Sequence, residues 1–217
     1  LDLATAVVVQ FQLQETGLEN ALLERRRLGD WAEIVLASRA RNDERIGFQT
    51  SGSTGQPKSC THRMALLEEE IAFFAGLLGD RRRVLSAVPS HHIYGFLFAV
   101  MLPARLGIPV RDTRAALPGG VLGRAEAGDL IVGHPAFHDL ATRAPLQVAD
   151  DVIALTSTGR CPKAVWRRLA ATGLSRVIEI YGATETGGIG WRDAPDAPFR
   201  LLPHWSRDGD SPLDILR

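Results

Sequence analysis

The sequence predicts an α/β fold in which a mostly parallel sheet is flanked by helices. Between residues 83 and 181, short apolar segments of strand length alternate with segments of helix length. This alternation is typical of βαβ units, whose helical crossovers make neighbouring strands parallel. The length of 217 residues suits one large domain or two small ones.

The N-terminal part contains one segment with helical spacing and one segment whose pattern leaves its structure open. Leu3–Leu13 is rich in apolar residues and fits either a strand or the start of a buried helix, because periodicity does not separate the two. Leu18–Ala37 carries apolar residues at helical spacing, with a break expected at Leu28–Asp30. Arg25–Arg27 is expected on a solvated helix face. Arg45–Gln49 is a predicted strand.

The rest of the chain supplies the predicted sheet and its helices. In the helix expected at 65–78, an apolar stripe faces inward and Glu68–Glu70 form the solvated side. In the helix expected at 96–106, Pro103 predicts a kink or a break. The other expected helices are 121–125, 136–143 and 162–172, and the expected strands are 83–88, 108–111, 129–132, 151–156 and 176–181.

Composition excludes several classes of protein. Lys plus Arg and Asp plus Glu number 25 each. The chain therefore lacks the basic excess that would indicate a nucleic-acid partner. No apolar run reaches the ~18 residues of a membrane-spanning helix. Cys60 and Cys161 have neither metal nor redox spacing. We therefore expect a cytoplasmic protein with free thiols and without a membrane partner.

The segment Thr50–Lys58 (TSGSTGQPK) has the composition of a phosphate-binding loop. Its glycines allow close approach of the backbone to a ligand, and successive N–H groups can then enclose an anion. A glycine- and serine-rich surface turn is the alternative, but it does not account for the order of these residues. The expected phosphate-binding residues are Thr50, Ser51, Gly52, Ser53, Thr54, Gly55 and Lys58.

Pro57 argues against the phosphate loop of kinases and ATPases. The segment Gly52–Ser59 nearly fits the pattern G-x-x-x-x-G-K-[ST], but Pro57 occupies the position of the second glycine. Proline has no N–H for a phosphate and has a restricted φ. The kinase interpretation is therefore rejected.

A second motif, Tyr181–Glu185 (YGATE), follows a predicted strand at its carboxyl end. Open α/β sheets place ligands at that end. Tyr181 offers a ring for stacking on adenine, and Thr184 can donate a hydrogen bond to a phosphate. Glu185 is an oxygen ligand suited to Mg²⁺.

Together, the two motifs resemble the signatures of the adenylate-forming (AMP-binding) superfamily, specifically the acyl- and aryl-CoA ligases that include 4-coumarate- and benzoate-CoA ligase-like enzymes. The resemblance implies that the loop at 50–58 binds ATP. It also implies that Tyr181, Gly182, Ala183 and Thr184 contact ATP and that Glu185 binds Mg²⁺. The implied catalytic residues are Thr184, Glu185 and Lys58.

Two further segments resemble parts of the same family. Pro89–Gly95 (PSHHIYG) is similar to a segment beside the acyl pocket, which implies that His92 and Tyr94 border the acid together with Gly182 and Gly187. Capping of a helix by His91 and His92 remains an alternative, whereas a metal site lacks further ligands. Thr156–Pro162 (TSTGRCP) is similar to a loop that lines the adenine and acyl sites, although an ordinary strand-to-helix turn fits equally well. The implied ATP-binding residues there are Ser157, Thr158 and Gly159.

The resemblance also implies the extent of the domain. Residues 1–217 correspond to the central part of the family's large N-terminal AMP-binding domain, and the small C-terminal domain with its lysine is absent. The segment Arg207–Asp210 (RDGD) follows YGATE too closely to be the family's ribose-binding motif, so a β-turn is expected at Asp208–Gly209.

The implied reaction is the activation of a carboxylic acid by ATP to an acyl-adenylate, followed by transfer to a thiol. The implied acid is an aryl acid such as hydroxybenzoate or coumarate, and medium-chain fatty acids are also compatible. The acceptor would be coenzyme A or the phosphopantetheine arm of an acyl carrier protein. An alternative of another class is a non-catalytic nucleotide-binding remnant that acts as a scaffold.

Overall fold

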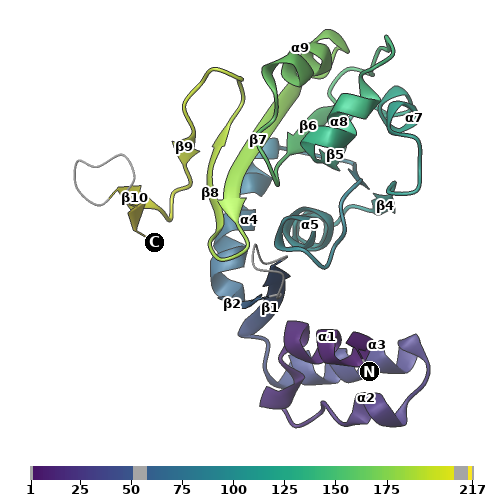
Figure 1. The fold of residues 1–217 in the computed structure, drawn as a ribbon, viewed down its shortest axis with the longest axis vertical. Helices are drawn as coiled ribbons and strands as arrows, with labels where there is room; N and C mark the ends of the chain where they lie inside the picture. Colours follow the sequence, from purple (N-terminus) through teal and green to yellow (C-terminus); the bar gives the residue numbers. More distant parts are fainter. Residues whose placement is uncertain (1, 51–57, 208–214, 217) are drawn as a thin grey trace. The chain divides into compact units, whose positions relative to one another are not determined.

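The computed structural model describes residues 2–50, 58–207 and 215–216 of the chain (Figure 1). These residues form two compact units, Leu1–Glu68 and Glu69–Arg217. Within the described residues, no helix combines the length and the apolar character needed to cross a membrane.

The N-terminal unit begins with helices packed around a small apolar core. Leu13 and Leu22 are fully buried there, next to Trp31 and Ile34. The segment Leu3–Leu13, for which the sequence allowed either a strand or a helix, is thus helical. The helices are α1 (Asp2–Phe11), the 3₁₀ helix η1 (Leu13–Glu15), α2 (Ala21–Glu24) and α3 (Leu28–Arg41).

The break in this helical region lies earlier than the sequence indicated. Residues 25–27 are exposed, as expected, but they form the non-helical link between α2 and α3. The segment 28–30, predicted as the break, is the first turn of α3. Gly29 therefore does not interrupt the helix, because its cost of ~1 kcal/mol is small enough for the rest of the helix to offset.

A β-hairpin completes the N-terminal unit. The strands β1 (Arg45–Thr50) and β2 (Lys58–Arg63) pair antiparallel, and Thr50 lies opposite Lys58 at the last pair. The hairpin thus brackets residues 51–57. The strand β2 was not predicted, because its sequence KSCTHR has little apolar content. The structure shows it as a strand through its pairing with β1.

The C-terminal unit contains the predicted α/β sheet. Among the described residues, this unit has a seven-stranded sheet with the strand order β4-β3-β5-β6-β7-β8-β9. Every pair from β4 to β7 is parallel, while β8 and β9 continue the sheet antiparallel. The mostly parallel sheet is confirmed. The bounds are β3 (Arg83–Ser86), β4 (Val110–Asp112), β5 (Asp129–Gly133), β6 (Ile153–Thr156), β7 (Arg176–Ala183), β8 (Gly187–Arg192) and β9 (Arg200–Leu201).

The helices α7 (Pro118–Gly123), α8 (Pro135–Ala141) and α9 (Lys163–Ala171) lie beside the sheet (Figure 1). They share a core with a row of side chains that neighbour one another across the strands, namely Leu85, Ile131, Ala154 and Val177. Alternate residues of these strands point to the opposite face. The helices that precede α7 in this part of the chain are α4 (Met64–Leu78), α5 (Ile93–Phe96) and α6 (Leu102–Leu106).

The helical segment around Pro103 is irregular, as predicted. The π-helical stretch η2 (Leu97–Met101) connects α5 to α6, and Pro103 follows in the first turn of α6. Proline cannot donate the i→i−4 hydrogen bond of a regular helix, which accounts for the altered hydrogen-bond pattern next to it.

The expected solvated face of α4 needs one correction. Glu70 is fully buried, with 0% of its surface exposed. Its carboxylate accepts hydrogen bonds from the Gly188 N–H, at 3.0 Å and 3.2 Å to the two oxygens. The carboxylate is therefore a link between α4 and β8 and not part of a solvated face.

The last described strands form a separate antiparallel pair, β10 (Ser206–Arg207) and β11 (Ile215–Leu216). The β-turn expected at Asp208–Gly209 lies outside the described residues.

Candidate functional site

The parallel strands bring several predicted segments to one edge of the sheet. Because β3, β5, β6 and β7 run in the same direction, the residues that follow them lie at their common carboxyl edge. Residues 89–92 follow β3, and residues 157–159 follow β6. The residues of YGATE occupy the end of β7 and the turn after it.

The backbone at the end of β7 is shaped for close approach. A β-bulge lies between Tyr181 and Gly182, opposite β8. A Cβ atom at Gly182 would lie 2.2 Å from the Gly187 carbonyl oxygen, so only glycine fits. Tyr181 is 55% exposed although it lies in a strand. The hairpin therefore presents an aromatic ring to solvent at the carboxyl edge of the sheet.

The turn after β7 carries Thr184 and Glu185. Thr184 is half-buried and Glu185 is exposed. The Thr186 hydroxyl accepts a hydrogen bond from the Ala183 N–H at 3.2 Å, which fixes the turn. In the described part of the chain, no group of three or more His, Cys, Asp or Glu residues is arranged to hold a metal. Glu185 nevertheless suits Mg²⁺, which often uses one carboxylate together with phosphates and water.

The segment that follows β6 is tightly held. The Ser157 hydroxyl is buried and donates to the Ile180 carbonyl at 2.9 Å. Thr158 has φ = 70°, in the left-handed region that residues with a Cβ rarely adopt. Such a conformation costs roughly 1–2 kcal/mol and persists only where surrounding contacts impose it. Gly159 has open space around it, since a Cβ atom added there would meet no heavy atom within 4 Å.

His92 and Tyr94 lie at the start of the helical segment after β3. His92 is the N-cap residue of α5, but its side chain makes no capping hydrogen bond. Burial, followed by the neighbouring His91, lowers the pKa of His92. Tyr94 is only 7% exposed, and its hydroxyl has no hydrogen-bond partner among the described residues. Burial raises the pKa of Tyr94 well above its ordinary value.

The predicted phosphate-binding loop is described only at its two ends. Thr50 ends β1, and Lys58 is exposed at the start of β2. The other residues assigned to this loop, Ser51, Gly52, Ser53, Thr54 and Gly55, lie outside the described residues.

A buried ion pair between β7 and β8 was not predicted. Glu179 accepts hydrogen bonds from the Arg192 Nε and a terminal guanidinium nitrogen, at 2.8 Å and 2.6 Å. Its other carboxylate oxygen accepts from the Cys161 N–H at 2.7 Å. A charged residue inside the apolar run of β7 was the signal in the sequence that this pair existed, since buried charges require partners.

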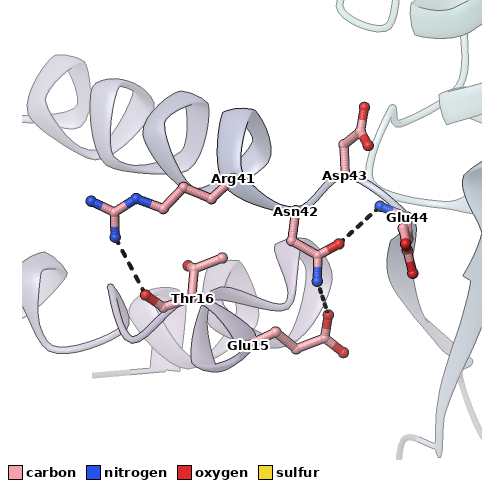
Figure 2. Close-up of a pocket in the computed structure, with 6 residues that line it drawn as sticks. All are labelled: Glu15, Thr16, Arg41, Asn42, Asp43 and Glu44. Carbon is pink, nitrogen blue, oxygen red and sulfur yellow. Dashed lines mark hydrogen bonds between the residues drawn. The ribbon is translucent and has the colours of Figure 1, made fainter.

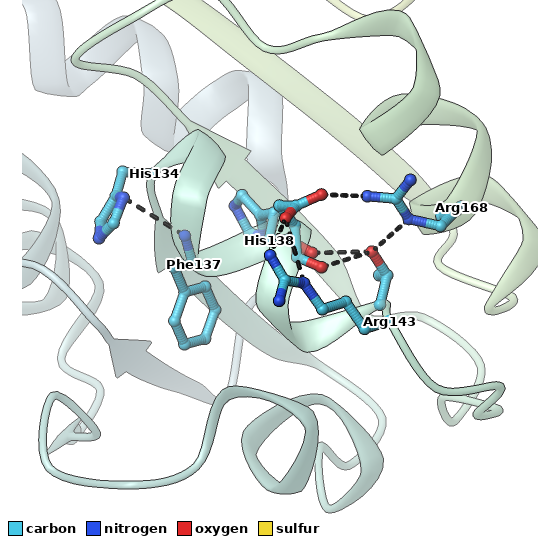
Figure 3. A network of polar contacts seen from close by, with 7 residues as sticks. His134, Phe137, His138, Arg143 and Arg168 are labelled. Atoms are coloured by element: carbon cyan, nitrogen blue, oxygen red, sulfur yellow. Dashed lines mark hydrogen bonds and ion pairs between the residues drawn. The ribbon is translucent and has the colours of Figure 1, made fainter.

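Two histidines near α8 also escaped prediction (Figure 3). His134 Nδ1 accepts a hydrogen bond from the Phe137 N–H at 3.4 Å at the start of the helix. His138 is fully buried, and its Nε2–H donates to the Leu155 carbonyl at 2.9 Å. Burial lowers the pKa of His138 to about 4. On the same helix, Asp139 forms ion pairs with Arg143 and Arg168.

The N-terminal unit has a polar hollow of its own (Figure 2). Asn42 donates to Glu15 at 2.9 Å and accepts from the Glu44 N–H at 3.1 Å. These contacts satisfy the polar groups internally, and none of the residues was predicted as a site residue. The hollow is lined by Glu15, Thr16, Arg41, Asn42, Asp43 and Glu44.

Comparisons with known proteins agree with this fold. A 4-coumarate–CoA ligase from Cereibacter sphaeroides is 42% identical over 217 aligned residues, which cover 94% of this chain and 51% of that protein. A 4-coumarate–CoA ligase from Halorhodospira halophila is 41% identical, covering the whole of this chain and 54% of its own length. The chain thus spans about half the length of these curated relatives.

Solved structures show the same fold at lower identity. ATP-bound MatB from Rhodopseudomonas palustris superposes with a TM-score of 0.62 at 20% identity, over 79% of this chain and 37% of that chain. O-succinylbenzoate coenzyme A synthetase from Bacillus subtilis, in complex with ATP and magnesium ion, has a TM-score of 0.59 at 20% identity, over 74% of this chain and 36% of that chain. The AMP-binding enzyme family matches residues 11–207. The chain therefore belongs to the family of AMP-binding enzymes.

Proposed function

We propose that this chain is part of an enzyme that uses ATP to activate a carboxylic acid, for which an aryl acid is the favoured substrate. The supporting observation is that Ser157, Tyr181 and Gly182 occupy the carboxyl edge of a parallel sheet in a chain of the AMP-binding family. The names of the curated relatives favour an aryl acid of the coumarate type.

The nucleotide is assigned to three segments of the chain. Tyr181 stacks on the adenine, and residues 182–184 follow the nucleotide along the hairpin. The segment 157–159 borders the base. Thr50, Lys58 and the loop between them bind the phosphates. In this proposal, residues 1–217 form part of the large N-terminal domain of the complete enzyme.

The acid is assigned to His92 and Tyr94 together with the backbone at Gly182 and Gly187. The buried Tyr94 hydroxyl has no partner among the described residues, so it is available to a polar group of the substrate. A buried hydroxyl without a partner is costly, and a bound ligand would remove that cost.

The proposed first step is an in-line displacement at phosphorus. A carboxylate oxygen attacks the α-phosphorus of ATP, the bond to the bridging oxygen breaks, and pyrophosphate leaves with the bonding electrons. The protein positions the reactants and neutralises charge. Mg²⁺, when bound to Glu185, would neutralise the phosphate oxygens, and Thr184 would donate a hydrogen bond to one of them.

In the second proposed step, the acyl group passes to the thiol of coenzyme A, while a carrier-protein phosphopantetheine is the alternative acceptor. The thiolate attacks the acyl carbon, and AMP leaves. The lysine-bearing small domain that would assist this chemistry is assigned to residues outside this chain.

The proposal is tested by carboxylate-dependent exchange of pyrophosphate into ATP, measured on the product of the complete reading frame with a panel of aryl and aliphatic acids. Exchange with aryl acids would support the proposal, and exchange with aliphatic acids alone would overturn the substrate class. No exchange with any acid, together with measurable ATP binding, would favour a non-catalytic nucleotide-binding module.

A further inference from the structure

The exposed Tyr181 ring is supported from within the protein by a second aromatic residue. The rings of Tyr181 and Phe199 lie 5.5 Å apart between centroids, inclined by 46°. Phe199 lies between β8 and β9 and is itself half-buried. Aromatic pairs at this separation attract each other beyond their burial, so Phe199 restricts the orientations that the Tyr181 ring adopts.

Phe199 is in turn held by a cation. The guanidinium carbon of Arg192 lies 4.6 Å from the centroid of the Phe199 ring, within the range of a cation–π interaction. Arg192 is buried, and its terminal nitrogen also donates to the Ala197 carbonyl at 3.4 Å. The segment that carries Phe199 is therefore fixed to β8 both through its ring and through its backbone.

The Arg192 side chain is immobilised by Glu179, which is only 2% exposed. Glu179 stands two residues before Tyr181 in β7, so both side chains leave the strand on the same face. The same carboxylate accepts from the N–H of Cys161, two residues after the 157–159 segment. One buried carboxylate thus fixes both segments to which the adenine is assigned.

We propose that Phe199 is a positioning residue for a purine nucleotide: held by the Arg192–Glu179 pair, it keeps the Tyr181 ring in the orientation that stacks on the base. This inference rests on the proposed function, because it takes the Tyr181 ring as the adenine contact. A purely structural role predicts lower stability when Phe199 is replaced, whereas a positioning role predicts weaker binding of the base.

The test is equilibrium binding of Mg·ATP and of inorganic tripolyphosphate to the complete protein and its Phe199→Leu variant. Leucine keeps an apolar side chain but removes the ring. We expect the Kd for ATP to rise by roughly 3- to 10-fold, the range of an aromatic pair, while the Kd for tripolyphosphate stays unchanged. The control Phe199→Tyr retains the ring and should bind ATP as the unmodified protein does.

A double-mutant cycle separates action through Tyr181 from direct contact with the nucleotide. If Phe199 acts through Tyr181, then Phe199→Leu has no further effect on ATP binding in a Tyr181→Ala background. Independent effects of the two changes, or equal weakening of ATP and tripolyphosphate, would overturn the inference. The inference would also be overturned if Phe199→Leu lowered the melting temperature but left the Kd for ATP unchanged.

The two proposals fail in different ways. If the unmodified protein binds no ATP, the nucleotide-binding function falls, and this inference with it. If it binds ATP and Tyr181→Ala weakens that binding while Phe199→Leu does not, only the positioning role of Phe199 is wrong.

Discussion

Individual side chains near the carboxyl edge have chemical properties set by burial. Cys161 is 1% exposed, and burial together with the negative charge of Glu179 raises the pKa of its thiol to about 12. The positive charge of Arg192 acts in the opposite direction but does not outweigh these effects. Cys161 therefore remains a neutral thiol, and its function is to pack in the core next to the ion pair.

We predict that Cys161 resists alkylation in the folded protein. With a pKa of about 12, only ~1 in 10⁴ of these thiols is ionised at pH 8, and the thiolate is the reactive form. Iodoacetamide labelling followed by peptide mass spectrometry should show slow modification of Cys161 in buffer and rapid modification in denaturant. Equal rates in both conditions would contradict the burial of this thiol.

Glu185 provides a second test at the scale of one residue. The change Glu185→Gln removes the negative charge that is proposed to bind Mg²⁺, and we expect roughly tenfold or greater loss of Mg-dependent pyrophosphate exchange. The exposed side chain predicts an unchanged melting temperature. Glu69→Gln, at an exposed position of α4, is the matched control and should retain activity. Full activity of the Glu185 variant would refute the metal assignment.

At the scale of elements, two buried ionisable groups tie helices to the sheet. His138 joins α8 to β6 through the Leu155 carbonyl, and Glu70 joins α4 to β8 through the Gly188 N–H. Each contact satisfies a backbone polar group that is remote from water. The two helices are therefore positioned by hydrogen bonds as well as by apolar packing.

The burial of His138, which lowers its pKa, predicts a stability that depends on pH. The pKa of His138 is about 4 in the folded protein, below the ordinary value of 6.5. Between these values the unfolded chain binds a proton that the folded protein does not, so stability falls as pH falls from 6.5 to 4. The full difference corresponds to about 3 kcal/mol.

Urea unfolding at pH 7 and pH 4.5 measures this effect. His138→Gln cannot titrate, and its amide can still donate a hydrogen bond, so the variant should lose less stability on acidification than the unmodified protein. The same loss in both proteins would show that His138 does not cause the pH dependence.

Glu70 gives a second prediction about stability at this scale. Glu70→Ala leaves the Gly188 N–H without the acceptor that it has in the folded protein, so we expect a loss of ~1–3 kcal/mol in the free energy of unfolding. Glu70→Gln keeps an acceptor oxygen and should lose less. The comparison is made by chemical denaturation, and equal destabilisation of both variants would argue against this hydrogen bond as the cause.

The elements that the sequence predicted well are those with strong local patterns. The parallel strands β3, β5, β6 and β7 are buried apolar runs, which is the pattern of strands covered on both faces. The strand β8 (GGIGWR) was missed because half of its residues are glycines, and its stability comes from pairing with β7. Such pairing between segments leaves no periodic signal in either one.

The candidate site was predicted only in part. The YGATE motif drew attention to the hairpin on which Tyr181 is exposed, because these residue types suit a nucleotide, and the nucleotide assignment stays a prediction. Glu70 was wrongly assigned to solvent, since three consecutive glutamates resemble a solvated helix face and the partner N–H lies 118 positions away in the chain. Nothing in the sequence pointed to Phe199 as a neighbour of Tyr181, because the fold of β8 and β9 brings the two rings together.

At the scale of the whole molecule, we propose that the carboxyl edge of the C-terminal unit is the nucleotide-binding surface. The buried carboxylates of Glu70 and Glu179 and the bulged hairpin hold the segments of this edge together. The polar hollow of the N-terminal unit serves as the control surface (Figure 2). Asn42 there forms hydrogen bonds with Glu15 and with the Glu44 N–H, and no ligand is assigned to it.

Hydrogen–deuterium exchange with and without Mg·ATP tests this claim most directly. We predict that ATP slows exchange in residues 157–161 and 181–188, and leaves exchange in residues 13–24 of the N-terminal unit unchanged. Protection confined to the N-terminal hollow, or bound ATP without protection at either carboxyl-edge segment, would contradict the assignment.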